Sequence, residues 1–362
     1  MASNRPSTLL LRVDGFGWQD CLATGPGSAI LGSLLFSALF LSPMSAKFLL
    51  RVAGTLLLAW AAAAACVALH TPLPWMLGPL VATSVLSMAG APTESWGPLR
   101  NGGQWAIGAA LGLYFTPEVS ALVGSLWWAI VLGIGWALLL GWGFGAWLYR
   151  LHAPRMHGVP ASMLRSTSYF AGAIGAASEM TLLSERENAR TDLVAASHSL
   201  RLLIVTITIP FALQWSGLQG LDILTPTVRE VSWPGLALLA LLTGAGALVM
   251  DRLGRANPWF MGAMLVSMAV TMAGLHLSAV PQALVNAAQL VIGVSLGVRF
   301  RAEFLHTAPR WLASVAVGTF GLMGICAAFA AVLAWATGLP WVTLLLGTSP
   351  GGITEMAITA KV

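Results

Sequence analysis

The sequence has few charged residues, and this scarcity excludes a soluble globular protein. Charged side chains make up 9% of the 362 residues, hydrophobic residues make up 57%, and the mean hydropathy is +0.81. A soluble domain carries about a quarter charged residues, so this chain cannot cover a globule with polar surface. Lipid must therefore surround most of it, and the lipid bilayer is its first expected partner.

Cysteine is also scarce, and neither cysteine nor histidine has the spacing of a metal site. The three cysteines lie far apart, and no two of the six histidines are three or four residues apart. These spacings argue against a disulfide framework and a histidine-built metal site. The chain also lacks a phosphate loop, a nucleophile paired with a base, and a basic DNA-recognition element. We therefore expect no metal, no cofactor, no enzymatic activity and no direct nucleic-acid partner.

What the sequence does contain fits a membrane: 16 Trp and 39 Gly, and many apolar runs. Trp favours membrane interfaces, and Gly lets membrane helices approach closely. Several runs are too short to span and carry Gly or Pro, which suggests broken or re-entrant helices. We expect an all-α polytopic membrane protein with about 10–11 membrane segments, counting these pieces.

The apolar runs match in two sets, in the same order along the chain. "LPWMLGPL" matches "NPWFMGAM", "GQWAIGAALGLYF" matches "AQLVIGVSLGVRF", and "GAASEM" matches "GGITEM". The basic loops fall at opposite places in the two sets, which by the positive-inside rule gives the sets opposite orientations. We expect two inverted-topology repeats, residues 44–215 and 216–362, with a functional site at their interface.

The two ends of the chain fit this duplication poorly. Residues 1–43 are expected to be an N-terminal extension outside the repeats, with one extra transmembrane helix as the alternative. After "GGITEM" the second repeat has only six more residues, so by symmetry it lacks a closing helix. On this expectation the carboxylate of Glu355 has no partner, and residues 340–362 are the least ordered membrane segment.

The stretches "TSPGGITEMAITAK", "SEMTLLSERENARTDLVAASHSLRLLIV" and "PWMLGPL" resemble the AbrB-type membrane protein family, which is defined by this duplication. The resemblance covers roughly Met44 to the end. It implies a bacterial inner-membrane protein, in a family labelled both as transcriptional regulators and as ammonia monooxygenases. The chain departs from the pattern in the first repeat, where residues 173–176 replace a Ser-Pro-Gly-Gly break.

Two matched glutamates are the sharpest candidates for chemistry. Glu179 and Glu355 each follow small, flexible residues within an apolar segment. A carboxylate at bilayer depth costs about 2.5–3.5 kcal/mol, so it normally faces a cavity or a partner. The functional interpretation is a proton- or cation-coupled site, and the alternative is that each glutamate caps a helix.

Other polar residues could join this substrate or ion site. His198 and Arg201 lie three apart on one helix face and could form a relay with Glu179, or Arg201 could snorkel to the surface. Gln104 and Gln289 occupy matched positions and could bind substrate or bond across helices. The break itself adds four residues: Ser349, Pro350, Gly351 and Gly352.

These features favour a secondary-transporter-like permease that handles an unknown small molecule or ion. The alternative is a membrane-embedded sensor that regulates gene expression through a partner without transport. An ammonia-oxidising enzyme is disfavoured because the sequence has no metal cluster. The sequence leaves the substrate and a homo-oligomeric state open.

Overall fold

The computed structural model describes residues 45–156, 158–175, 177–216, 230–300 and 308–359, and every regular element in these ranges is a helix. The all-α prediction is confirmed. By its contacts the chain divides into Met1–Leu49 and Leu50–Val362. The first unit is described only from residue 45, so the expected extension, residues 1–43, lies outside the described residues. The contacts given below all lie within Leu50–Val362.

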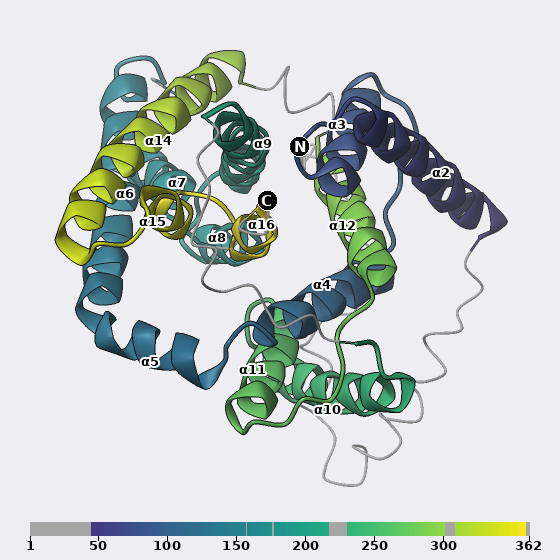
Figure 1. Cartoon of the computed structure of the whole chain (residues 1–362). Coiled ribbons are helices and arrows are strands. Elements are labelled where there is room, and N and C mark those ends of the chain that lie inside the picture. The colour runs from purple at the N-terminus through teal and green to yellow at the C-terminus, as the bar shows by residue number, and fades with distance from the viewer. Residues whose placement is uncertain (1–44, 157, 176, 217–229, 301–307, 360–362) are drawn as a thin grey trace, which may run out of the picture. The chain divides into compact units, whose positions relative to one another are not determined.

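The helices alternate between long apolar ones and shorter ones (Figure 1). In the N-terminal half they are α2 (Ala46–Ala68), α3 (Pro74–Met88), α4 (Gly97–Gly112), α5 (Pro117–Ser125), α6 (Trp127–His152), α7 (Ala161–Gly172), α8 (Ala177–Arg186) and α9 (Thr191–Ser216). In the C-terminal half they are α10 (Trp233–Arg252), α11 (Pro258–Met272), α12 (Gln282–Gly297), α14 (Pro309–Thr337), α15 (Trp341–Thr348) and α16 (Ile353–Thr359).

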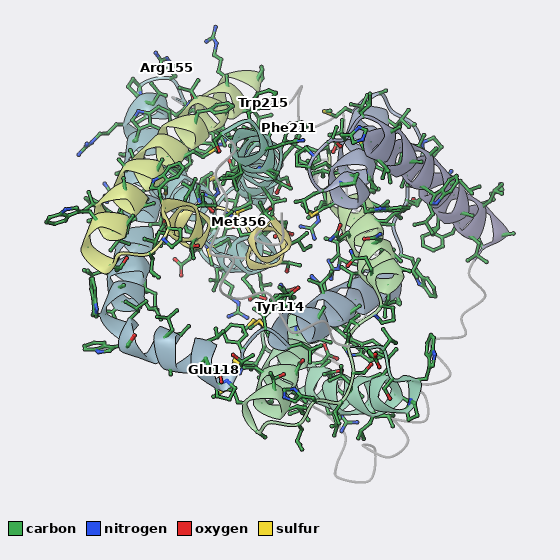
Figure 2. All side chains as sticks on the ribbon, in the orientation of Figure 1. Tyr114, Glu118, Arg155, Phe211, Trp215 and Met356 are labelled. Atoms are coloured by element: carbon green, nitrogen blue, oxygen red, sulfur yellow. The ribbon has the colours of Figure 1, made fainter. Side chains whose placement is uncertain are left out.

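Five of these helices are long and apolar enough to cross a membrane: α2, α6, α9, α10 and α14. A sixth span results if α4 and α5, which meet at an angle of 85°, form one bent crossing. Figure 2 labels Tyr114 and Glu118 on either side of this bend. The expected 10–11 segments also counted half-spanning pieces, and α3, α11 and α12, with 15 or 16 residues each, are such pieces. At 1.5 Å per residue they reach about 24 Å, less than the hydrocarbon layer.

A first helix group consists of α3, α4, α10, α11 and α12. Two of its most extensive contacts run between the two halves of the sequence: α4 packs on α11, and α3 packs on α12. A Cβ added to Gly108 of α4 would overlap the carbonyl oxygen of Phe260, and a Cβ added to Gly293 of α12 would come within 2.6 Å of the carbonyl oxygen of Met76. Glycine is therefore required at both positions, because only glycine lets the backbones approach this closely.

A second helix group consists of α6, α7, α9, α14 and α15. Within it α6 and α14 run antiparallel. The rings of Trp136 and Phe329 stack 4.3 Å apart, and about four turns further along α6 the His152 Nε2 lies 3.1 Å from the Ser314 hydroxyl. The C-terminal end of α6 therefore lies beside the N-terminal end of α14.

The short helix α16 contacts both groups. Its Ile358 belongs to the apolar core of α3, α4, α11 and α12, whereas its Met356 belongs to the core of α9, α14 and α15. Figure 1 shows α16, in yellow, beside α9, and Figure 2 labels Met356 on it.

Candidate functional site

The site begins at a break in the apolar segment that starts with α15. Ser349 is extended, with φ −66° and ψ 148°, because the residue before a proline avoids the helical conformation. The last turn of α15 bonds to its own side chains: Thr348 Oγ1 donates to the Leu344 carbonyl at 2.8 Å, and Ser349 Oγ donates to the Leu346 carbonyl at 3.0 Å. Residues 349–352 thus separate two short helices, as the sequence predicts.

Glu355 lies in the first turn of α16 and is 7% exposed. Its carboxylate folds back over Gly352, where a Cβ would overlap the carboxylate oxygen Oε2. The neighbouring side chains close the site further, since Thr354 is 3% exposed and the Met356 side chain covers Gly351. The break places a carboxylate in the protein interior, and a side chain at position 352 would displace this carboxylate from its position.

One arginine attracts this carboxylate, and a second arginine interacts with the first. Arg299 follows the end of α12 and attracts Glu355 electrostatically, and Arg100 in the first turn of α4 repels Arg299. Arg299 is thus a cation that attracts Glu355, although the ion pairs among the described residues are Arg51–Glu94 and Arg190–Asp192. The expectation that Glu355 lacks an ion-pair partner stays a prediction. With two guanidinium groups and one carboxylate, the cluster has an excess of positive charge that can attract an anionic group.

A chain of hydrogen bonds joins three helices around the same point. Gln104 Nε2 of α4 donates to Asn257 Oδ1 at 2.7 Å, and Asn257 Nδ2 donates to Thr354 Oγ1 at 3.4 Å. Asn257 caps α11 in the left-handed conformation, with φ 54°, which Asn adopts more readily than most residues. The side chains of α4, α11 and α16 are thus held in register beside Glu355.

The first break, between α7 and α8, is built differently. Arg201 of α9 is 3% exposed and donates to the carbonyls of Ala171, Gly172 and Ala173 at 3.4, 3.1 and 2.8 Å. These are carbonyls at the end of α7 that have no partner within the helix, and a cation is favourable at a helix C-terminus. The idea that Arg201 snorkels to the surface is wrong, because the side chain turns inward to cap α7.

His198 completes this cap. Its Nε2 lies 2.8 Å from the Phe170 carbonyl and its Nδ1 lies 2.9 Å from an Arg201 nitrogen. Arginine only donates, so Nδ1 accepts and Nε2 carries the proton that it donates to Phe170. The relay with Glu179 does not form in the structure: Glu179 is half-buried at the start of α8, and the ion pairs among the described residues are Arg51–Glu94 and Arg190–Asp192.

The basic residues of the loop before α9 are also committed elsewhere. Arg190 contacts Asp192 through two hydrogen bonds, of 3.2 and 2.5 Å, and this contact raises the pKa of Arg190. Its backbone N–H donates to Thr167 Oγ1 at 3.0 Å, which ties the loop to α7. Glu179 and Glu355 are matched in sequence, yet only Glu355 lies in a polar cluster.

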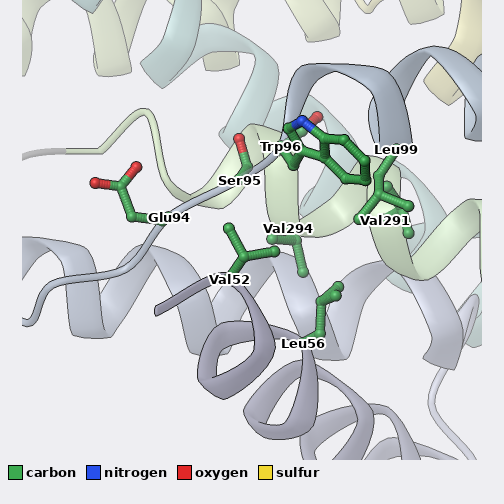
Figure 3. A pocket seen from close by; sticks show the side chains of 9 residues that line it. Val52, Leu56, Glu94, Ser95, Trp96, Leu99, Val291 and Val294 are labelled. Atoms are coloured by element: carbon green, nitrogen blue, oxygen red, sulfur yellow. The ribbon is translucent and has the colours of Figure 1, made fainter. Parts of the chain in front are cut away.

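Neither a small hollow beside α2 and α12 nor a cluster of metal-ligand side chains provides a further site among the described residues. A hollow of about 10 Å³ beside α2 and α12, shown in Figure 3, has Glu94 at its edge and room for about one water molecule. No three His, Cys, Asp or Glu side chains lie together as metal ligands in the part of the chain that the structure describes.

Comparison with known proteins places the chain in a family. The family described as "Transition state regulatory protein AbrB" matches residues 75–362. The chain belongs to the AbrB family. It is 26% identical over 298 residues to "Putative regulator AbrB" of Escherichia coli (strain K12), covering 81% of this chain and 82% of that protein. It is 23% identical over 313 residues to "Uncharacterized protein YhjN" of Bacillus subtilis (strain 168), covering 79% of this chain and 78% of that protein. No solved structure matches it.

Of the candidates from sequence in this AbrB-family chain, the structure brings Glu355, Gln104 and the break at residues 349–352 together. Gln289 on α12, which matches Gln104, is 6% exposed. Gln104 bonds to Asn257, but the position before α3 that matches Asn257 is Leu73, which has no side-chain amide to bond to Gln289. His198 and Arg201 lie at the other break. Sequence reasoning missed Asn257, Thr354, Arg299 and Arg100. Arg299 follows an apolar helix directly and was read as a loop charge, and Asn257 differs from its match Leu73 in a way that could have been noticed.

Proposed function

We propose that this AbrB-family membrane protein is a secondary-transporter-like permease with its substrate or ion site at Glu355. The observation that carries the proposal is the buried carboxylate at a helix break, in contact with helices from both halves of the sequence. Secondary transporters commonly place their sites at broken helices, at the interface of internal repeats. The proposal assigns no catalytic reaction to the chain.

The contacts between the halves support a pair of inverted repeats, residues 44–215 and 216–362. Gly108 packs on Phe260 and, at the matched positions, Gly293 packs on Met76, so the same contact is made twice with the halves exchanged. The matched helices α6 and α14 run antiparallel. Both features are expected of two copies related by a twofold axis in the membrane plane.

The polar cluster suggests how such a site would work. Glu355 can take up a proton or hold a cation, because burial favours its neutral form while the attraction of Arg299 favours its charged form. When Glu355 is protonated, Arg299 and Arg100 are left with an excess of positive charge for an anionic substrate group. Protonation and anion binding would then be coupled, and rearrangement of α16 between the two helix groups would expose the site to either side.

Orientation can be tested without a ligand. Reporter fusions after Arg155 and Arg310 should both report the cytoplasm, and fusions after Glu118 and Gly338 should both report the periplasm, because basic loops stay inside. Arg155 and Arg310 belong to the ends of α6 and α14 that lie together. If the fusions after Glu118 and Gly338 report opposite sides, the inverted-repeat proposal fails.

The site is tested by Glu355→Gln with Glu179→Gln as its matched control. A thermal-shift screen of carboxylates, amino acids, phosphates and amines on the purified full chain would first identify a stabilising compound. Gln cannot take up or release a proton, so Glu355→Gln should bind an anionic compound with no dependence on pH. It should weaken binding of a cationic compound by about 10–100-fold, since a hydrogen bond to a charged group is worth about 1.5–3 kcal/mol. Glu179→Gln should bind either compound with the affinity and pH dependence of the wild type. Binding by Glu355→Gln that equals that of the wild type at every pH would leave Glu355 only a capping role.

Flux of the same compound across proteoliposomes decides between transport and sensing. A permease should move it, and faster when a pH gradient is imposed, if Glu355 carries the coupled proton. The printed name of the Escherichia coli relative raises a regulatory role as the alternative. Saturable binding to the wild-type protein with no flux in either direction would favour that alternative.

A further inference from the structure

A second concave region lies away from the Glu355 cluster, between α6 and α7. It has a volume of about 790 Å³ and shares no residue with that cluster. Its walls are two helix faces and one residue after α8: Trp142, Gly145, Ala146, Tyr149, Arg150, Arg165, Ser166, Tyr169, Phe170 and Glu187. Sites that take small organic molecules have volumes of about 300–1,000 Å³, so this groove can hold one.

The groove changes in chemistry from one end to the other. A Cβ on Gly145 would come within 3.1 Å of the Tyr169 Cα, whereas the Arg165 guanidinium lies 5.5 Å from the centre of the Tyr149 ring. The two helices therefore run antiparallel along the groove. One end is lined by Trp142, Gly145, Ala146 and Phe170, and the other end by Arg150, Arg165 and Ser166.

This gradient follows the depth of α6 in a bilayer. The helix is a candidate span from Trp127 to His152, so Arg150 lies in its last turn, at the level of the headgroups. Trp142, two turns deeper, is 64% exposed and continues an exposed apolar surface that includes Leu138, 69% exposed. The apolar end of the groove is thus open to the hydrocarbon layer and the basic end is open to the interface.

The two arginines have no acidic partner of their own. Neither Arg150 nor Arg165 is in an ion pair within the part of the chain that the structure describes, although Glu187 lines the same groove. Tyr149 holds Arg165 in place through a cation–π contact, which leaves the edge of its guanidinium group free to donate. Two guanidinium groups and one carboxylate at one rim fit a phosphate ester that is followed by an ammonium group.

We propose that this groove binds a phospholipid with an ethanolamine headgroup. Its phosphodiester accepts hydrogen bonds from Arg150 and Arg165, its ammonium group pairs with Glu187, and one acyl chain lies along Trp142, Ala146 and Phe170. The lipid fills the open side of the α6–α7 pair. This binding is independent of the proposed transport, because none of these residues contacts the polar cluster around Glu355.

The test is native mass spectrometry of the full-length protein after exchange into micelles containing equal amounts of phosphatidylethanolamine and phosphatidylglycerol. The wild type should retain one phosphatidylethanolamine. The variant Arg150→Gln/Arg165→Gln should retain it about tenfold less, since each guanidinium supplies charge-assisted hydrogen bonds. The matched control Arg155→Gln/Arg310→Gln removes two basic side chains outside the groove and should retain the lipid as the wild type does.

Two further variants separate the parts of the proposal. Glu187→Gln should abolish the preference for phosphatidylethanolamine while phospholipid is still bound. Ala146→Phe should fill the chain-binding end and release the lipid with both arginines intact. Retention that is equal in the groove variant and its control overturns the proposal. So does full displacement of the lipid by soluble glycerophosphoethanolamine, because the groove would then recognise a free phosphate ester rather than a lipid.

Discussion

The two helix breaks occupy matched positions in the two halves of the sequence, yet their polar groups are used in opposite ways. At the first break a cation from α9, Arg201, satisfies the end of α7, and the nearby carboxylate of Glu179 is half-buried without an ion pair in the described residues. At the second break the helix end bonds to its own Thr348 and Ser349, and the carboxylate of Glu355 is buried beside Arg299.

The difference shows that matched sequence segments need not make matched polar contacts. The first break is closed: three carbonyl oxygens and a histidine nitrogen accept hydrogen bonds from the two terminal nitrogens of Arg201. The second break keeps a titratable group between two helix groups. One copy thus holds the fold together, and the other has a group that can change its charge, which is the property a coupled site needs.

The largest effect on stability is expected from removing the Arg201 side chain at the first break. Arg201→Ala leaves the carbonyls of Ala171, Gly172 and Ala173 buried and without donors, and each such group costs about 1–3 kcal/mol. We expect a loss of about 3 kcal/mol or more in the free energy of unfolding. Tryptophan fluorescence during thermal unfolding in detergent measures it.

Arg155→Ala is the matched control for this prediction. Arg155 is exposed and its Nη1 donates to a single carbonyl, that of Leu151, at 2.7 Å. Its removal should change stability by no more than about 0.5 kcal/mol, as for most surface substitutions. Arg201→Ala and Arg155→Ala melting at the same temperature would show that the cap on α7 is dispensable.

The second helix break could be predicted from the sequence, but the burial of Glu355 beside a basic residue could not. Pro350 with Gly351 and Gly352 predicts a break, because a proline followed directly by two glycines strongly disfavours a continuous helix, whereas the single prolines Pro79 and Pro210 lie within α3 and α9. The burial of Glu355 near a basic residue could not be predicted, since Arg299 follows α12 in another part of the chain and interacts with Glu355 only in the folded protein. In the sequence, a basic residue that follows an apolar helix gives the same pattern whether its side chain faces water or a buried carboxylate.

The role of Arg201 shows the same limit from the other side. Its position on one face with His198 predicted a polar pair, and the pair exists, with 2.9 Å between the two nitrogens. The sequence did not indicate that the backbone carbonyls at the end of α7 are the acceptors for Arg201. Every residue has a backbone carbonyl, so residue types do not show which carbonyls will accept a hydrogen bond. A carboxylate partner was therefore expected where the fold supplies three carbonyl oxygens.

A smaller effect should come from making the second copy resemble the first at the start of α11. Asn257→Leu introduces the residue found at the matched position before α3. It removes the bonds to Gln104 and Thr354 and places a bulky residue at φ 54°. A non-glycine residue in the left-handed region costs about 1–2 kcal/mol, so we expect a loss of about 2 kcal/mol on thermal unfolding.

Asn257→Gly separates the two causes, because glycine adopts the left-handed conformation freely but has no amide. It should lose about 1 kcal/mol, the value of the hydrogen bonds alone. If Asn257→Gly is as unstable as Asn257→Leu, the backbone conformation contributes nothing. If both variants melt like the wild type, the hydrogen-bonded chain from α4 to α16 does not support the site.

The smallest effect, and the most local one, is expected at Gly352. A Cβ there would overlap the Oε2 of Glu355, so Gly352→Ala must rotate the carboxylate away from its position at the start of α16. An off-rotamer side chain costs about 0.5–1.5 kcal/mol, which corresponds to at most about tenfold in ligand affinity.

Gly347→Ala is the matched control: Gly347 lies in α15 with nothing within 4 Å of an added Cβ, and alanine there should raise helix stability by up to about 1 kcal/mol. Thermal-shift titration of both variants with the compound found for the wild type measures the two effects. Weaker binding in Gly352→Ala, with unchanged binding in Gly347→Ala, would show that ligand binding depends on the position of the Glu355 carboxylate. Unchanged binding in both variants would show that it does not.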